Sequence, residues 1–104
     1  MIMRLNFYED PGHGWLAVPI PLLDKLGIID RISHYSYMRG MLAHLEEDCD
    51  YAVFARAMND AGRFFTVKHH HTDHRSRIRN YCQFNAGVAR RWMAEAQLSR
   101  QLAR

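Results

Sequence analysis

Apolar and polar residues alternate in several short stretches of the chain, which is the pattern of a strand with one buried face. In residues 41–46, every second residue from Met41 onward is apolar. In the stretch FFTVKHH, Phe65 and Val67 fall on the same side. The alternation predicts five strands, at residues 1–8, 15–18, 32–38, 41–46 and 64–70.

A helical period follows the fourth of these strands. At about 100° per residue, one face of residues 51–61 is apolar. Asp48 or Asp50 is placed to cap the beginning of this helix, and Gly62 to end it. The apolar face consists of Val53, Phe54, Ala57, Met58 and Ala61, with Tyr51 at its edge. Two further helices are predicted, from Pro21 to Leu26 and over residues 85–104.

The order of these elements predicts an α+β fold. Asp10–Gly14 (DPGHG) is a turn between the first two strands, because proline fixes φ and glycine accepts a positive φ. We expect an antiparallel or mixed sheet of about five strands with two or three helices on one face, followed by a C-terminal amphipathic helix. With 104 residues the chain makes one domain, with residues 1–84 as the core and residues 85–104 as the C-terminal helix.

The composition excludes some classes of protein. The hydrophobic fraction of 48% is that of a globular chain, and no apolar run approaches the roughly 20 residues of a membrane span. The first ten residues, MIMRLNFYED, lack the layout of a signal peptide. We therefore expect a cytoplasmic protein without a membrane partner, in which Cys49 and Cys82 are reduced. Because these two cysteines have no CxxC spacing, they make no zinc site.

Charge is distributed unevenly along the chain. The net charge is +3, but residues 1–60 hold five basic and nine acidic side chains, a net of −4. Residues 61–104 hold nine basic against two acidic side chains, a net of +7. Such polarity can steer binding to a nucleic acid or to a protein of mixed charge, and it can also be neutralised within the fold.

Four carboxylates gather between the fourth strand and the helix after it. A helix N-terminus favours acidic side chains, which is the simplest explanation. A calcium loop needs a longer ligand spacing and an internal glycine. An acidic patch that meets a basic partner is the remaining interpretation. The candidate partner-binding residues here are Glu46, Glu47, Asp48 and Asp50.

Arginines concentrate after residue 74, among aromatic residues. Arg75, Arg77 and Arg79 alternate, so in an extended segment they point the same way. Guanidinium groups beside aromatic rings suit phosphate contact and base stacking. They suit acidic protein surfaces equally well, and a solvated charged loop is the third interpretation. The candidate binding residues here are Arg75, Arg77, Arg79, Arg90 and Arg91.

A run of histidines, HHHxxH, ends the fifth strand. His69 and His71 share a face and His74 lies beyond the strand, so three imidazoles can converge on a transition metal. The other interpretation is a polar strand end with solvated or hydrogen-bonded imidazoles. No carboxylate or cysteine at a familiar ligand spacing supports a metal, so these residues are weak candidates and no cofactor is expected.

Catalysis has little support in the sequence. There is no GxSxG, P-loop or GxGxxG motif. Cys49 with His44 or His34 can be drawn as a nucleophile and its base, but the neighbouring carboxylates disfavour a thiolate. We therefore expect a protein that binds rather than an enzyme.

The C-terminal helix carries an apolar stripe that includes Val88, Trp92 and Leu98. This stripe can dock on the body of its own chain, which we favour, or form a homodimer.

Three motifs, DPGHGW at residues 10–15, ISHYSY at 32–37 and LEEDCD at 45–50, resemble a group of small proteins from phages, plasmids and prophage regions of proteobacteria. The resemblance covers about residues 7–84 and carries no catalytic residue. It implies a protein of a mobile element, of the kind that binds host machinery. Anti-CRISPR proteins are the best-known inhibitors of this kind.

Three hypotheses follow for the function. The first is stoichiometric inhibition of a host defence complex, of the anti-CRISPR type, by binding a host protein or ribonucleoprotein. The second is a nucleic-acid-binding accessory or regulatory protein that uses the arginine-rich segment 75–91. The third is a metal-binding protein with histidine ligands.

Overall fold

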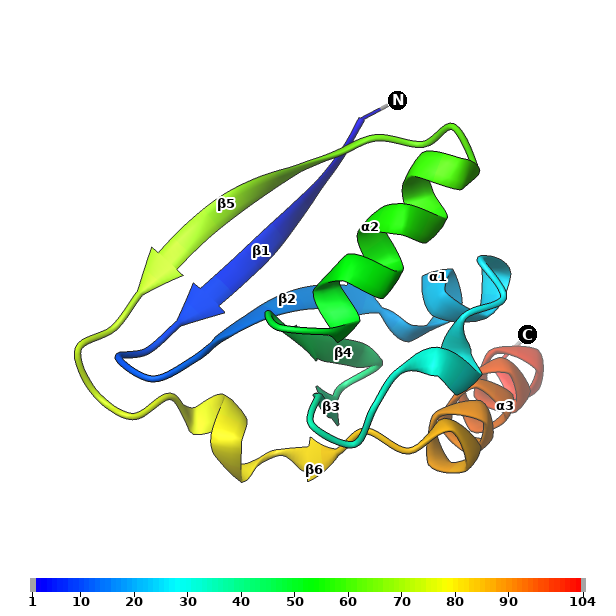
Figure 1. The fold of residues 1–104 in the computed structure, drawn as a ribbon. Helices are drawn as coiled ribbons and strands as arrows, with labels where there is room; N and C mark the ends of the chain where they lie inside the picture. Colours follow the sequence, from blue (N-terminus) through cyan, green and yellow to red (C-terminus); the bar gives the residue numbers. More distant parts are fainter. Residues whose placement is uncertain (1, 104) are drawn as a thin grey trace.

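The computed structural model describes residues 2–103, which form an α+β fold with one six-stranded sheet (Figure 1). The strand order is β5-β1-β2-β4-β3-β6, and only β1 and β5 pair in parallel. The predicted fold class is confirmed; the predictions for Met1 and Arg104 lie outside the described residues. The strands are β1 (Met3–Glu9), β2 (Gly14–Pro19), β3 (Tyr37–Arg39), β4 (Leu42–Glu46), β5 (Phe65–His71) and β6 (Cys82–Gln83). The helices are α1 (Ile20–Lys25), α2 (Asp50–Asp60) and α3 (Ala86–Leu102), with 3-10 turns η1 (Ile29–Arg31) and η2 (Arg77–Asn80).

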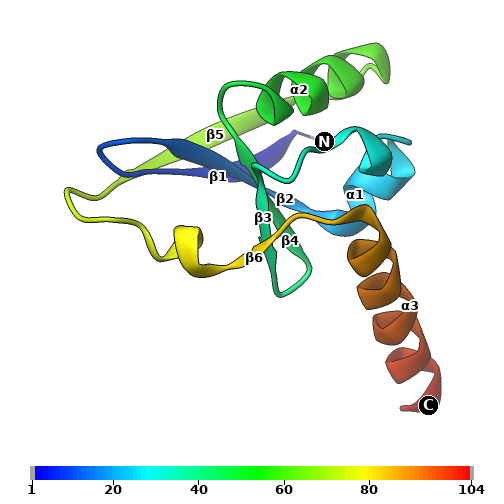
Figure 2. The same cartoon turned by 60° about the horizontal axis from the view of Figure 1, so that its bottom comes forward.

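Helix α2 buries one face of the sheet. Its Phe54 and Met58 are almost completely inaccessible, as predicted from the helical period, and they join Leu16 of β2 and Leu45 of β4 in the core. Each such side chain contributes roughly 1.5 to 3 kcal/mol to folding. Helices α1 and α3 pack at the end of the sheet, and α2 lies over this face, where two or three helices were expected (Figures 1 and 2). In residues 2–103, the opposite face carries the 3-10 turn η2 but no α-helix.

The predicted strand at residues 32–38 is shorter than expected. Only Tyr37–Arg39 form β3, because the residues before it turn around a buried carboxylate. Three groups donate hydrogen bonds to Asp50 Oδ2: the Ser33 N–H at 3.0 Å, the Ser33 hydroxyl at 2.7 Å and the Ser36 hydroxyl. Ser33 and Ser36 are thus bonded to Asp50 and lie outside the paired strands. The free edge of β3 pairs instead with β6, the strand that the sequence did not predict.

Two turns of the fold use glycines with a positive φ. Gly27 follows α1 with a φ of +73°. Between β3 and β4, Gly40 and Met41 have φ values of +57° and +66°, the pair of positive angles that a tight hairpin requires. Because Met41 belongs to this turn, β4 begins at Leu42 and not at Met41.

Helix α3 docks on its own chain through its first half. The Asn85 side chain caps it by accepting from the Val88 N–H at 3.0 Å, and Ala89 is buried. Leu98 and Leu102 are 54% and 77% exposed, because the second half extends away from the body (Figure 2). In residues 2–103, no helix combines the length and the apolar character that crossing a membrane requires.

Candidate functional site

The face of the sheet opposite α2 carries a groove of about 840 Å³. Tyr8 of β1 and His44 of β4 form its floor, because they alternate with the residues that face the core. Residues 72–81 form its wall, where the chain leaves β5 and crosses this side of the sheet to reach β6 (Figure 2). We call it the arginine groove. It is lined by Tyr8, Arg39, Gly40, Leu42, His44, Thr72, Arg75, Ser76, Arg77, Ile78, Asn80 and Tyr81.

The arginine groove is positively charged. Arg39, Arg75 and Arg77 line it, and within the described chain its lining contains no Asp or Glu. Arg75 Nη1 donates to Asn80 Oδ1 at 3.2 Å, and the Arg39 guanidinium lies 5.1 Å from the centre of the Tyr81 ring. Both arginines are thus oriented by uncharged partners, which leaves their charge available to an anionic ligand.

A row of rings follows the groove across the sheet. His70 of β5 stacks on Tyr8 with centroids 4.8 Å apart and planes at 20°. Tyr8 lies 6.4 Å from the His44 ring, which in turn meets Tyr81 edge-on at 5.2 Å. The row brings together residues from β1, β4, β5 and the wall segment. Tyr8, His70 and Tyr81 are half-buried. Aromatic rings beside guanidinium groups are the features with which proteins stack unpaired bases.

His44 is the buried polar residue of the groove floor. It is 6% exposed, and its Nδ1 has no hydrogen-bond partner among the described residues. Burial lowers the His44 pKa from its usual value of 6.5 to about 4, because the charged imidazolium loses its hydration. At neutral pH the floor of the groove is therefore uncharged while its rim is cationic.

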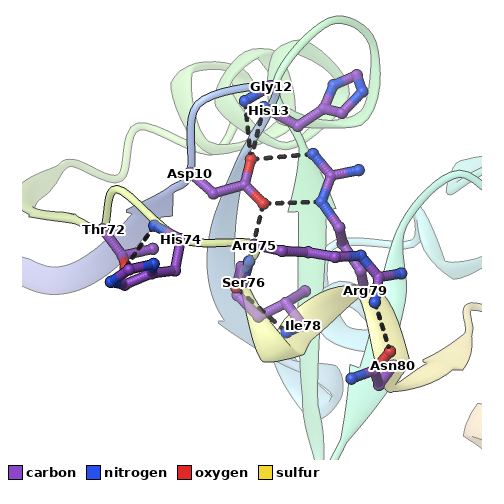
Figure 3. Close-up of polar contacts among 10 residues, drawn as sticks. All are labelled: Asp10, Gly12, His13, Thr72, His74, Arg75, Ser76, Ile78, Arg79 and Asn80. Atoms are coloured by element: carbon purple, nitrogen blue, oxygen red, sulfur yellow. Dashed lines mark hydrogen bonds and ion pairs between the residues drawn. The ribbon is translucent and has the colours of Figure 1, made fainter.

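Asp10 fixes the wall of the groove to the body of the protein (Figure 3). Its carboxylate is 1% exposed and accepts five hydrogen bonds. Two come from the turn, from the Gly12 and His13 N–H groups at 3.0 Å each. Three come from the wall, from the Ser76 N–H at 2.9 Å and from Arg79 Nε and Nη2 at 2.7 and 2.9 Å. The Arg79 guanidinium, more than the backbone donors, holds the pKa of Asp10 well below its usual range.

The three alternating arginines do not point the same way. The segment turns into η2 at Arg77, where the Ser76 hydroxyl accepts from the Ile78 N–H at 3.2 Å. Arg75 and Arg77 line the groove, whereas Arg79 turns back to Asp10 and lies 5.2 Å over the Trp15 ring. Arg79 therefore has a structural role, and the expectation of a common direction, which assumed an extended segment, is wrong.

The other two candidate arginines lie on α3, outside the groove lining. Arg90 forms two bonds with Asp30, with Nη1 to Oδ1 at 2.9 Å and Nη2 to Oδ2 at 2.6 Å. Arg91 is exposed. The five candidate arginines are therefore not on one surface. Arg75 and Arg77 line the groove, and Arg79 forms an ion pair with the buried Asp10. Arg90 and Arg91 lie on α3.

The acidic cluster is mostly structural. Glu46, and neither predicted aspartate, caps α2 by accepting from the N–H groups of Asp48, Cys49 and Asp50 at 2.7 to 2.9 Å. Asp50 is 2% exposed and holds the serine turn before β3, so it is not a surface residue for a partner. Glu47 and Asp48 remain exposed.

The histidine run does not converge on one point. His69 packs on Phe7 at 5.4 Å, whereas His71 contacts Asp73 at 3.0 Å and Glu9 at 3.5 Å. Asp73, more than Glu9, raises the His71 pKa. Among residues 2–103, no group of three His, Cys, Asp or Glu side chains is arranged to hold a metal ion, His74 included.

Sequence reasoning missed most residues of the groove floor. His44 was placed on the polar side of its strand, but nothing nearby in the sequence indicates that the wall segment covers it. The other groove residues lie far apart in the sequence: Tyr8 in β1, Arg39 in β3 and Tyr81 between η2 and β6. One available signal was Asp10, the acidic residue that opens the predicted Asp10–Gly14 turn, because an aspartate in a turn commonly accepts backbone N–H bonds.

The sequence matches no protein-family model, and neither the curated proteins nor the solved structures give a match. The resemblance to proteins of mobile elements stays a prediction.

Proposed function

We propose that the protein binds a nucleic acid in the arginine groove and leaves it chemically unchanged. One observation carries this proposal: three arginines and a row of aromatic rings share one groove whose lining, in the described chain, contains no acidic residue. Arginines contact phosphates through planar, multiple hydrogen bonds, and rings stack on bases. This is the second of the three hypotheses drawn from the sequence, restricted to Arg75 and Arg77 and extended to Arg39.

Salt dependence of binding tests the proposal. Each phosphate contact releases counterions, so the logarithm of the affinity falls with the logarithm of salt concentration by about 0.7 per contact on a single strand. We expect Arg75→Ala/Arg77→Ala to weaken binding of a fluorescent oligonucleotide and to flatten this slope by about 1.4. Fluorescence anisotropy gives both the affinity and the slope when binding is measured between about 50 and 300 mM salt, a range over which charges become more strongly screened.

A matched control removes the same charge elsewhere. Arg91 and Arg100 are exposed on α3, and Arg91→Ala/Arg100→Ala lowers the net charge by the same amount. We expect this variant to keep most of the slope. A flat salt response of the unmodified protein, or equal effects of the two double variants, would rule out binding in the groove.

The inhibitor hypothesis is a second proposal with its own surface. Tyr35 is 68% exposed and lines a hollow with Tyr37 and Asp48, close to Glu46 and Cys49. Arg79 also lines this hollow but is paired with Asp10, so the aromatic rings and the acidic side chains remain, which suit a basic segment of a host protein. In this proposal, Tyr35→Ala/Asp48→Ala abolishes co-purification with a host complex while Arg75→Ala/Arg77→Ala does not. We also propose a cytoplasmic location, with which the free, exposed Cys49 and Cys82 agree.

A further inference from the structure

The rim and the floor of the arginine groove differ in chemistry. The rim carries Arg39, Arg75 and Arg77, whereas the floor presents Tyr8, Leu42 and His44, which are uncharged or, for His44, neutral at pH 7. A phosphate gains most at the rim, where guanidinium groups can reach it. The floor has no cation for a phosphate and instead offers ring faces and an imidazole, which match a base.

The unpartnered nitrogen of His44 supports a ligand at this floor. Buried polar atoms nearly always have a hydrogen-bond partner, and leaving one without it costs free energy. His44 Nδ1 is such an atom, on a residue that is 6% exposed and lines the groove. The surrounding rings of Tyr8 and Tyr81 supply no donor or acceptor contact to it among the described residues. A neutral imidazole has one donor and one acceptor, which is what a base edge can pair with.

We infer that the arginine groove selects single strands, by taking one unstacked base onto its floor between Tyr8 and Tyr81 with the base edge against His44. This inference rests on the proposed function. A duplex keeps its bases stacked and paired, so it can offer phosphates to Arg75 and Arg77 but no base to the floor. The groove therefore distinguishes nucleic acids by whether a base is free.

The test compares four ligands of equal length and label: single-stranded RNA, single-stranded DNA, duplex DNA, and an abasic strand that keeps the phosphates. We expect both single strands to bind about tenfold more tightly than the duplex and the abasic strand, since stacking one base contributes a factor of this order. The difference between RNA and DNA shows whether the 2′-hydroxyl is also read.

Variants separate the floor from the rim. His44→Phe keeps a ring of similar size and removes both nitrogens; it is expected to change the relative affinities for oligo-A, oligo-C, oligo-G and oligo-U without changing the salt slope. Tyr8→Leu is expected to reduce the preference for single strands over the abasic strand. Arg75→Ala/Arg77→Ala is expected to change the slope and to keep that preference. Circular dichroism and thermal melts establish that each variant is folded.

Two failures are distinguishable. If no ligand binds, the proposed function and this inference both fall. If duplex, abasic and single strands bind equally, or if His44→Phe leaves the order of base preference unchanged, the nucleic-acid function stands and the base-selecting floor is overturned.

Discussion

Asp10 and Arg79, 69 positions apart in the chain, form a two-bonded ion pair, with Nε–Oδ2 and Nη2–Oδ1 distances of 2.7 and 2.9 Å. The pair ties the β1–β2 turn to the wall of the arginine groove, with side-chain exposures of 24% for the arginine and 1% for the aspartate. A Cβ at Gly12 would lie 2.8 Å from Arg79 Nη2, so a side chain there would displace the guanidinium from its place beside Asp10. The groove therefore depends on a contact that lies outside its own lining.

Asp10→Ala is expected to lower the free energy of unfolding by about 2 to 4 kcal/mol. The substitution leaves the Arg79 guanidinium and three backbone N–H groups without their acceptor. Urea unfolding followed by circular dichroism measures the change. Asp30→Ala is the control, since it breaks the exposed pair with Arg90, where the Asp30 side chain is 70% exposed, and should shift the unfolding midpoint little. Similar losses for both variants would contradict a structural role for Asp10.

Asp50 tests the assignment of the acidic cluster, in which Asp50 stabilises the fold and Asp48 lies on the surface. Asp50→Ala removes the acceptor of Ser33 and Ser36 from a site that is 2% exposed, so we expect a loss of about 2 to 3 kcal/mol in the free energy of unfolding. Asp48→Ala changes the same residue type two positions away on the surface, and should cost less than about 0.5 kcal/mol. If the order is reversed, the assignment of Asp50 to the fold and of Asp48 to the surface is incorrect.

The fold was predictable where local periodicity decides the structure. In strands β1 and β5 the more buried residues largely alternate with exposed ones, and in helix α2 they follow the helical period, as the sequence patterns show directly. Strands β2 and β4 are buried on both faces beyond what their patterns show. The loop before β3 was mistaken for a strand because ISHYSY alternates, although a carboxylate 14 positions beyond Ser36 holds it in a turn. Local patterns carry no information on such a distant acceptor.

The groove was predictable only in part, for the same reason. The arginines of the wall stand out in the sequence, so Arg75 and Arg77 were found. Their direction depends on Asp10, and the burial of His44 depends on the wall lying over its strand. A period of two places His44 on the polar face, and only the tertiary structure shows that this face is covered.

Stability is expected to fall as the pH decreases from 6.5 to about 4, because His44 stays neutral in the fold while the unfolded chain takes up a proton near pH 6.5. The loss from this residue is at most about 3 kcal/mol and is complete below pH 4. His71 has the opposite sign: its raised pKa gives stability that is fully present below pH 6.5 and lost as the pH rises through the raised pKa, so the His71 contribution stays constant between pH 6.5 and 4. Asp10 has a lowered pKa and loses its contribution only below pH 3.8.

Unfolding free energies at about pH 6.5, 5.5 and 4.5 measure this slope, because the usual histidine pKa is about 6.5 and the His71 contribution is constant below it. His44→Phe should make the curve flatter than that of the unmodified protein. His34→Gln, which changes an exposed histidine, should leave it unchanged. A slope that survives His44→Phe would mean that other groups cause the pH dependence.

The exposed end of α3 gives the last prediction. Leu98→Ala/Leu102→Ala is expected to change the free energy of unfolding by less than about 0.5 kcal/mol, because the two side chains are 54% and 77% exposed and alanine favours a helix. Trp92→Ala is the comparison, since Trp92 packs against the core from the docked half of the same helix and should cost about 2 kcal/mol. Unfolding measured at two protein concentrations separates the possible arrangements of α3. The double variant could instead lose as much stability as Trp92→Ala, and only at the higher concentration. The end of α3 would then pack on a second copy of the chain, and its leucines would not face solvent.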